Sequence, residues 1–236
     1  MFACASTPVT LAPARRRGRH HRVHASRSRA LASDDEDATL KRVIDFARSS
    51  RTLNDAIDAS AQADIDALIA NGRVDGGITN AVRGDGQWDV FCAPHIQRLA
   101  TPVGVCFHPL RYVIEEGKIR SDVRHGGAWV PDGWLSASGT VSVGEEMTCE
   151  GRLRPSCVIK FDKFWIGARE GDASAPRDWP ENGNAIDRAI DAIGSVGFLE
   201  SFARFPVLFY DEAEGLVIFQ FPPLSSNICA LRGRCS

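Results

Sequence analysis

The sequence predicts a mainly β (α+β) fold: an antiparallel β-barrel of about eight strands with N-terminal helices and one late helix. The 236 residues are 44% hydrophobic and 25% charged, a balance typical of a globular domain. From Gly86 onward, apolar and polar residues alternate with a period of two, as they do in half-buried strands. Short connections between these segments favour antiparallel hairpins, and closure into a barrel removes the exposed sheet edges.

Residues 39–71 carry a helical pattern instead. Leu40, Val43 and Ile44 recur at the three- to four-residue spacing of one helix face. The pair Asn71-Gly72 is typical of the end of a helix. We therefore expect two or three short helices here, and helices this short are stable only when they pack on the rest of the fold.

The alternation is clearest in two segments, Lys118–His125 and Leu135–Val143, which predict strands with one solvated face. Further strands are expected at Gly86–Phe91, Arg111–Ile114, Met147–Leu153, Cys157–Phe164, Pro206–Tyr210, Leu216–Phe221 and 226–231. We place a turn at Pro155 and a late helix over Ala185–Ile193, after a long surface loop. One folded domain spanning 39–232 accounts for all of these elements.

The first 33 residues have a different composition. They contain seven arginines and no acidic residue, and they lack the apolar core of a secretory signal. This is typical of an organelle transit peptide, so we expect 1–33 to be a disordered targeting segment that is removed. Pro8 and Pro13 disfavour an early amphipathic helix, which favours the chloroplast, stroma or thylakoid-associated, over the mitochondrion.

Charge and hydropathy exclude some classes of partner. The chain carries a formal charge of −2, and without its seven N-terminal arginines the remainder is about −9. Duplex binding needs clustered cations against phosphate, so we expect no nucleic-acid partner, with an RNA-binding basic arm as the alternative. No apolar run reaches the roughly 18 residues of a transmembrane helix, so any membrane contact is expected to be peripheral.

Seven cysteines occur, but none form a Cys-x-x-Cys pair, so the sequence indicates neither a zinc ribbon nor a thioredoxin-type pair. We expect most of them to be small buried hydrophobes in strands. Cys229 and Cys235, near the end of the chain, are the better candidates for redox pairing.

Two stretches resemble a known family. Gly86-Gln87-Trp88 resembles the Gly-x-Trp strand that begins lipocalins and the matching strand of the plastid lipid-associated (fibrillin) proteins. The stretch YDEAEGLVIFQF, which ends at Phe221, looks like the closing hairpin of the fibrillin domain. It carries Gly215-Leu216-Val217 where that family usually has an arginine pair. The resemblance implies a lipocalin-like barrel in which Trp88 closes one end beneath the helices.

The same resemblance implies that the protein binds either a hydrophobic small molecule or the thylakoid lipid surface. It does not imply a particular cofactor. A carotenoid, quinone, tetrapyrrole or acyl chain suits a barrel lined by aromatic residues. Leu135, Ala137, Gly139 and Val141 form the apolar face of the clearest strand and are expected to line the interior with Trp88. The small residues Ala137 and Gly139 fit either a cavity or a tight corner.

His95, His108 and Arg111 flank strand ends, and we expect them to form a polar cluster at one mouth. An enzyme such as an isomerase or cyclase is the first alternative, and it would use His95, His108 or Asp162. An assembly factor with a filled barrel is the second. Neither a nucleophile elbow, a P-loop nor metal-ligand spacing is present, so we assign no catalytic or metal residues.

Overall fold

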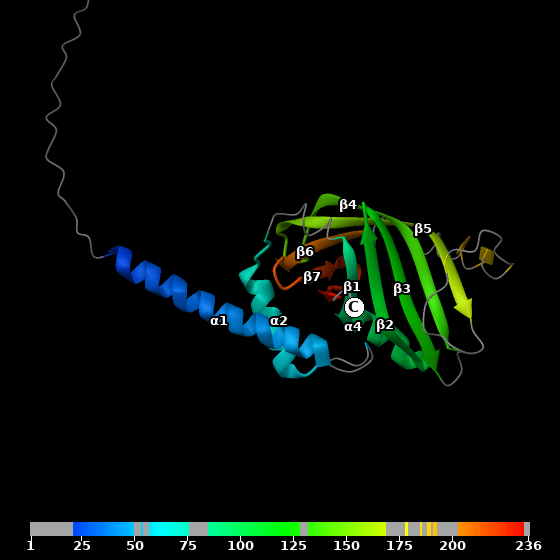
Figure 1. Ribbon diagram of the computed structural model, residues 1–236, viewed down its shortest axis with the longest axis horizontal. Helices are drawn as coiled ribbons and strands as arrows, with labels where there is room; N and C mark the ends of the chain where they lie inside the picture. Colours follow the sequence, from blue (N-terminus) through cyan, green and yellow to red (C-terminus); the bar gives the residue numbers. More distant parts are fainter. Residues whose placement is uncertain are drawn as a thin grey trace, which may run out of the picture. The chain divides into compact units, whose positions relative to one another are not determined.

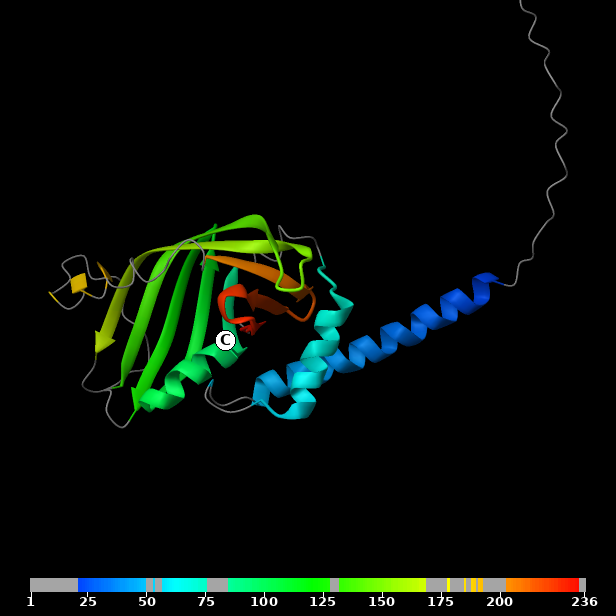
Figure 2. The same cartoon turned by 180° about the vertical axis from the view of Figure 1, so that it is seen from behind.

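The computed structural model describes residues 21–49, 53, 57–75, 85–127, 132–168 and 203–233, together with six isolated positions between 178 and 192 (Figures 1 and 2). The chain divides into two compact units, Met1–Ala38 and Thr39–Ser236. The β-sheet and everything that packs on it belong to the second unit.

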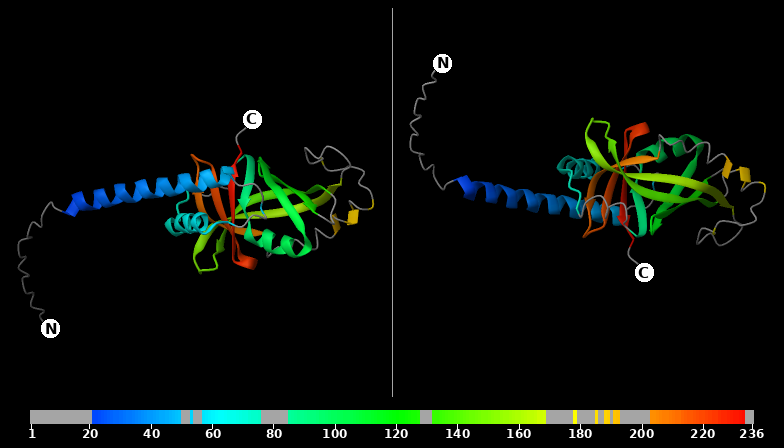
Figure 3. Two further views of the ribbon diagram at one scale, coloured as in Figure 1. Left: turned by 90° about the horizontal axis from the view of Figure 1, so that it is seen from below. Right: turned by 90° about the horizontal axis from the view of Figure 1, so that it is seen from above.

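Eight strands close into one barrel in which each pairs antiparallel with its neighbour along the chain. Strand β8 runs beside β1, so the last strand closes the sheet against the first (Figure 3). This confirms the predicted mainly β barrel. The strands are β1 (Gly86–Cys92), β2 (Val105–Glu115), β3 (Lys118–Gly127), β4 (Gly133–Met147), β5 (Leu153–Ala168), β6 (Arg204–Asp211), β7 (Leu216–Phe221) and β8 (Ser226–Arg232).

One predicted strand and one predicted turn were wrong at the β4–β5 hairpin. Met147–Leu153 is not a strand but the tip of the hairpin, where Met147 pairs with Leu153 and Gly151 has a φ of 74°. That backbone conformation costs glycine little, which makes this the turn. Pro155 lies within β5 opposite Glu145, one residue before β5 begins to pair with β6 at Ser156. On its β6 side Pro155 precedes the paired part of β5, a position at which proline is tolerated.

Three α-helices have bounds within the described residues: α1 (His21–Ser49), α2 (Ala59–Asn71) and α4 (Pro94–Ala100). Helix α1 begins well before residue 39, inside the segment 1–33 that we expected to be disordered. Its sequence has no glycine or proline and is rich in alanine and arginine, both strong helix formers. Within the described residues, no helix is long and apolar enough to cross a membrane.

Local signals fix the ends of α2. The Asp58 side chain accepts a hydrogen bond from the Ala61 backbone N–H at 2.7 Å, which caps the first turn. Gly72 has a φ of 63° and donates its N–H to the Leu68 carbonyl, so the helix ends where Asn71-Gly72 predicted. The expected late helix lies mostly outside the described residues, although Ala185 and four others in that range are helical.

The apolar core has two layers. The inner layer fills the barrel and includes Trp88, Leu110 and Ile119. The outer layer lies between the barrel wall and the helices: Val43 and Ile44 of α1 and Ile65 and Leu68 of α2 pack with outward-facing residues of β1, β6, β7 and β8. These short helices are thus stabilised by the strands, as expected. Figures 1 and 2 show α2 beside β6 and β7.

The β6–β7 hairpin is held from two sides. Asp211 is buried, accepts the Glu214 N–H at 2.7 Å and forms an ion pair with Arg73. Val74 adds a short parallel bridge to Tyr210. The turn between β6 and β7 therefore ties the segment after α2 to the barrel.

Candidate functional site: a groove outside the barrel

The barrel interior is nearly full. Its cavity has a volume of about 40 Å³ and is lined by apolar side chains and Tyr112. This is roughly the volume of one water molecule in the liquid, about 30 Å³. Burial raises the pKa of Tyr112 to about 12, as expected for a phenol inside an apolar core. A carotenoid, quinone or tetrapyrrole has no room here unless side chains move.

Only some of the predicted lining residues reach this cavity. Trp88 and Val141 line it. Ala137 is buried, and Leu135 is half-buried further along β4. Gly139 stands at a β-bulge in the pairing of β4 with β5, where an added Cβ would collide with the backbone carbonyl of Lys160. The small residue at Gly139 therefore serves a close backbone approach at a bulge, and not a cavity.

His95 does not join His108 and Arg111. It lies on α4, a helix that the sequence analysis did not anticipate, and its Nδ1 is 3.0 Å from the Ser226 hydroxyl. Its ring also packs on Phe221, with 4.7 Å between ring centroids. Burial, with a contribution from the charge of Arg98, lowers the pKa of His95 to about 4. His95 therefore acts as a neutral, packed residue that holds α4 against β8.

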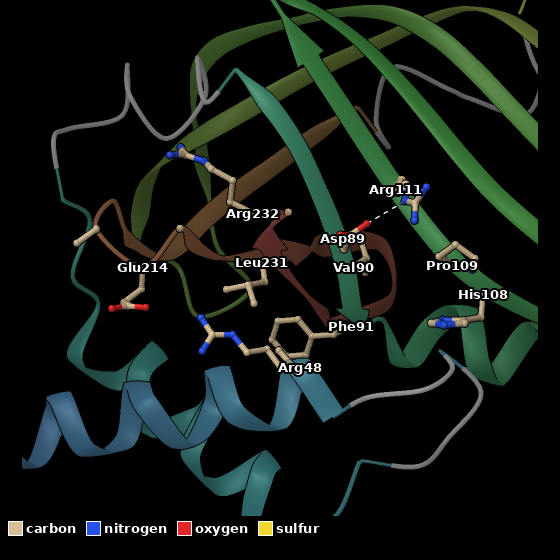
Figure 4. A pocket seen from close by; sticks show the side chains of 14 residues that line it. Arg48, Asp89, Val90, Phe91, His108, Pro109, Arg111, Glu214, Leu231 and Arg232 are labelled. Atoms are coloured by element: carbon tan, nitrogen blue, oxygen red, sulfur yellow. Dashed lines mark hydrogen bonds and ion pairs between the residues drawn. The ribbon is translucent and has the colours of Figure 1, made fainter. Parts of the chain in front are cut away.

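A groove on the outer surface of the barrel has a volume of about 660 Å³, far more than the interior cavity (Figure 4). It lies over the outer face of β1, and its wall comes from the end of α1, from β2, from the β6–β7 turn and from the end of β8. The residues that matter for its chemistry are Arg48, Asp89, Phe91, His108, Arg111, Glu214, Leu231 and Arg232.

Three arginines and two carboxylates give the groove its charge. Arg111 Nε lies 3.0 Å from Asp89 Oδ1, so this pair is neutralised. Arg232 stacks its guanidinium on Trp88, 4.8 Å from the ring centroid, and its buried Nε has no hydrogen-bond acceptor among the described residues. Exposed Arg48 likewise has no carboxylate partner within that part of the chain. Arg48 therefore leaves the groove with a cation for a ligand, whereas the Arg232 guanidinium is engaged with Trp88 and with the Tyr210 hydroxyl.

An apolar wall accompanies these charges. Phe91 is buried and makes an edge contact with Phe46 of α1, with ring centroids 6.3 Å apart. Leu231 faces outward from β8 and is half-buried. Figure 4 shows Arg48 and Phe91 on the α1 side of β1, with His108, Pro109 and Arg111 on the β2 side. An amphipathic molecule can thus place its charged and apolar parts in one hollow.

Two of these residues, His108 and Arg111, were predicted from the sequence as site residues, but at a barrel mouth. They lie on the outer face because the β2 pairing with β3 shifts between Phe107 and Leu110. Arg48 and Arg232 were not predicted. They lie in elements far apart in the sequence, and only the packing of α1 on the barrel and the closure of β8 against β1 bring them to the rim of one groove.

A second polar cluster lies on the outer face of β3, β4 and β5. Asp122 is buried and accepts hydrogen bonds from Arg120 Nε at 2.9 Å and from the Ser136 hydroxyl at 2.6 Å. Arg120 also stacks over Trp165 at 5.5 Å from the ring centroid. Asp162, proposed for acid–base chemistry, is exposed on β5. The satisfied partners of Asp122 indicate a structural role.

The described residues contain no group of three or more histidine, cysteine or acidic side chains that could hold a metal ion. The protein is therefore a closed, eight-stranded antiparallel barrel with a charged groove on its outer surface. No protein-family model matches this chain, and no curated protein or solved structure is significantly similar to it. The resemblance to the fibrillin family therefore stays a prediction from the two stretches that carry it.

Proposed function

We propose that this protein is a non-enzymatic plastid binding protein whose outer groove holds an amphipathic anion, either an acidic lipid or a lipophilic carboxylate. The observation that carries the proposal is the groove of about 660 Å³, which combines an apolar wall with Arg48, an exposed arginine that forms no ion pair with any described residue. Small-molecule sites occupy about 300–1,000 Å³. The interior cavity of about 40 Å³ falls far below that range, which favours the external groove as the binding site.

Electrostatics favour an anion. Arg48 is exposed at the end of α1, while Arg232 is held in place by its contact with Trp88. A carboxylate or phosphate placed beside Arg48 would gain charge-assisted hydrogen bonds, which are about twice as strong as neutral ones. The folded part of the chain is otherwise acidic, so this attraction is specific to the groove and is not a general property of the surface.

The apolar wall favours a ligand with a hydrophobic part. Phe91 and Leu231 form a surface on which an acyl chain or ring could be buried, and each buried CH₂ contributes about 0.8 kcal/mol. The ligand could come from a membrane surface or from solution. In both cases the same chemistry recognises it: an anionic head beside Arg48 and an apolar body along Phe91.

Titration calorimetry with oleate, and with oleyl alcohol as the uncharged match, tests the proposal. We expect oleate to bind more tightly, and Arg48→Gln to weaken its binding by about 10- to 100-fold, the value of one charged hydrogen bond. Arg152→Gln is the matched control, because Arg152 is exposed at the β4–β5 tip and does not line the groove. Equal affinities for R48Q and R152Q would exclude the groove as the site.

Sedimentation with vesicles separates the two sources of ligand. Binding to phosphatidylglycerol vesicles but not to phosphatidylcholine vesicles, lost in R48Q, indicates an acidic membrane lipid. Oleate binding without vesicle binding indicates a free carboxylate. If neither ligand binds, the function proposed for the groove is wrong.

A second candidate function rests on the filled interior and on the β4–β5 hairpin. Val143, Met147 and Leu153 are 44%, 52% and 61% exposed. Their strand register places all three on one face of this hairpin. Exposed apolar clusters of this kind mark interaction surfaces, which favours the assembly-factor alternative. The triple change of these residues to serine should abolish capture of a partner from a plastid extract while leaving oleate binding intact.

The enzyme alternative gains no support from the site. Its three candidates lie in separate places: His95 is packed under α4, His108 lines the groove and Asp162 is exposed on β5. General acid–base chemistry needs such groups within hydrogen-bond reach of one reacting atom.

A further inference from the structure

Cys92 and Cys229 meet at the seam of the barrel. Cys92 is the last residue of β1, Cys229 lies within β8, and the two are direct partners in the β1–β8 register. Both are free thiols and almost fully buried, at 2% and 0% exposure. β1 and β8 are the first and last strands, so their pairing closes the barrel.

A β-bulge brings the two thiols to the same face. Val90 pairs with Ala230 and Cys92 pairs with Cys229, so β1 accommodates one additional residue, Phe91. In a regular strand Cys92 would point inward like Val90, two residues earlier, while Cys229 would point outward. Instead, Cys92 joins Phe91 and Cys229 in the outer apolar layer.

The two side chains also interact. A hydrogen bond with Cys92, together with burial and the nearby charge of Asp66, raises the pKa of Cys229. A protonated, buried thiol reacts slowly, because the thiolate is the nucleophile in disulfide exchange. Among the other described cysteines, Cys106 and Cys149 are exposed and Cys157 lies inside the barrel. The sequence indicated Cys229 and Cys235 as the better candidates for redox pairing, and Cys235 lies outside the described residues.

We propose that Cys92 and Cys229 form an oxidisable dithiol site that becomes a disulfide staple between β1 and β8. The oxidant is a small or protein disulfide, written RSSR. One cysteine thiolate attacks RSSR, which forms a mixed disulfide and releases one RSH after protonation. The second thiolate displaces the other RS group. Two protons and two electrons pass from the cysteines to the oxidant, giving one new S–S bond and two RSH.

The helices control access to this site. The outer apolar layer that contains both cysteines also contains Val43 of α1 and Ile65 of α2. An oxidant can reach the thiols only when this layer opens, so the oxidation rate should follow the population of the open form. Once formed, the cross-link joins the two ends of the barrel and constrains the unfolded chain, which raises stability.

Peptide mapping of the full chain tests the proposal. The reduced protein is incubated with oxidised glutathione, alone and in urea below the unfolding transition, then alkylated and digested without reductant. We expect a Cys92–Cys229 cross-linked peptide that forms faster in urea. We also expect the oxidised protein to unfold at higher denaturant concentration than the reduced protein, a shift that dithiothreitol reverses.

Variants provide the matched comparison. Cys92→Ala and Cys229→Ala should each abolish the shift, whereas Cys106→Ala should keep it, because Cys106 is exposed on β2. If an alanine variant does not fold, the peptide map of the unchanged protein alone shows whether Cys92 and Cys229 form the disulfide. Recovery of a Cys229–Cys235 peptide, or of glutathione on Cys106 with no Cys92–Cys229 peptide, would overturn the proposal.

Discussion

At the scale of single residues, Trp88 on β1 contacts residues from β6 and β8 and shares the inner apolar layer with the segment before α2. It is 3% exposed, packs near Tyr210 with 6.5 Å between ring centroids, and carries the Arg232 guanidinium on its face. It also shares the inner apolar layer with Leu53, from the segment predicted to be helical. This is the burial that the Gly-x-Trp stretch predicts.

Truncating Trp88 to alanine should lower the free energy of unfolding by about 3–5 kcal/mol, because it leaves a cavity in the inner layer. Chemical denaturation measures this value. Val113→Ala on neighbouring β2 is the control, since Val113 is 37% exposed and should change stability little. If W88A lowers the free energy of unfolding by less than about 1 kcal/mol, Trp88 is not a tightly packed core residue.

His95 makes stability depend on pH. Its pKa lies at about 4 in the folded protein, below the ordinary 6.5, so the unfolded chain takes up a proton first as pH falls. Its contribution to stability is therefore complete above about pH 6.5 and is lost progressively between about 6.5 and 4. His95→Gln should flatten this part of the stability profile, measured by urea unfolding at a series of pH values. Parallel profiles for the two proteins would contradict this assignment.

At the scale of elements, the β6–β7 hairpin depends on Asp211 more than its sequence suggests. Asp211 caps its own turn and pairs with Arg73, on the segment that follows α2. Sequence patterns located both strands and the turn. They could not show the partner, because Arg73 precedes Asp211 by more than a hundred residues and no local spacing relates them.

Asp211→Ala should cost about 1.5–3 kcal/mol, the contribution of hydrogen bonds to a charged group, and should loosen the segment around Val74. Denaturation measures the first effect and hydrogen exchange at Asp75, whose N–H donates to the Tyr210 carbonyl, measures the second. The control is Glu212→Ala, since Glu212 is the exposed neighbour in the same turn. Equal effects of the two changes would show that the Arg73 pair contributes nothing.

At the scale of the whole molecule, the division into Met1–Ala38 and Thr39–Ser236 bears on targeting. The basic composition of 1–33 predicts removal of this segment in the plastid. Helix α1 nevertheless begins at His21, so this segment can form a helix even though its composition suggested disorder. Among the described side chains, those that are buried begin at Thr39.

A truncated chain that begins at Asp34 should therefore unfold at the same denaturant concentration as the full chain, because it keeps every buried side chain described. Mass spectrometry of the protein recovered from plastids should show a start close to residue 33. A native protein that begins at Met1 or Phe2 would refute the targeting prediction, and a lower midpoint for the truncated chain would show that 1–33 stabilises the barrel.

By itself, the sequence determined the class of fold and most strand positions, because alternation and turn residues act over only a few neighbours. It located Leu216–Phe221 at its observed bounds and the end of α2 at Asn71-Gly72. Only the tertiary structure decided that the interior is filled, since cavity volume depends on side chains from every strand at once. It also decided the groove and the Cys92–Cys229 pair, because strand closure and a bulge place residues together that no sequence period relates.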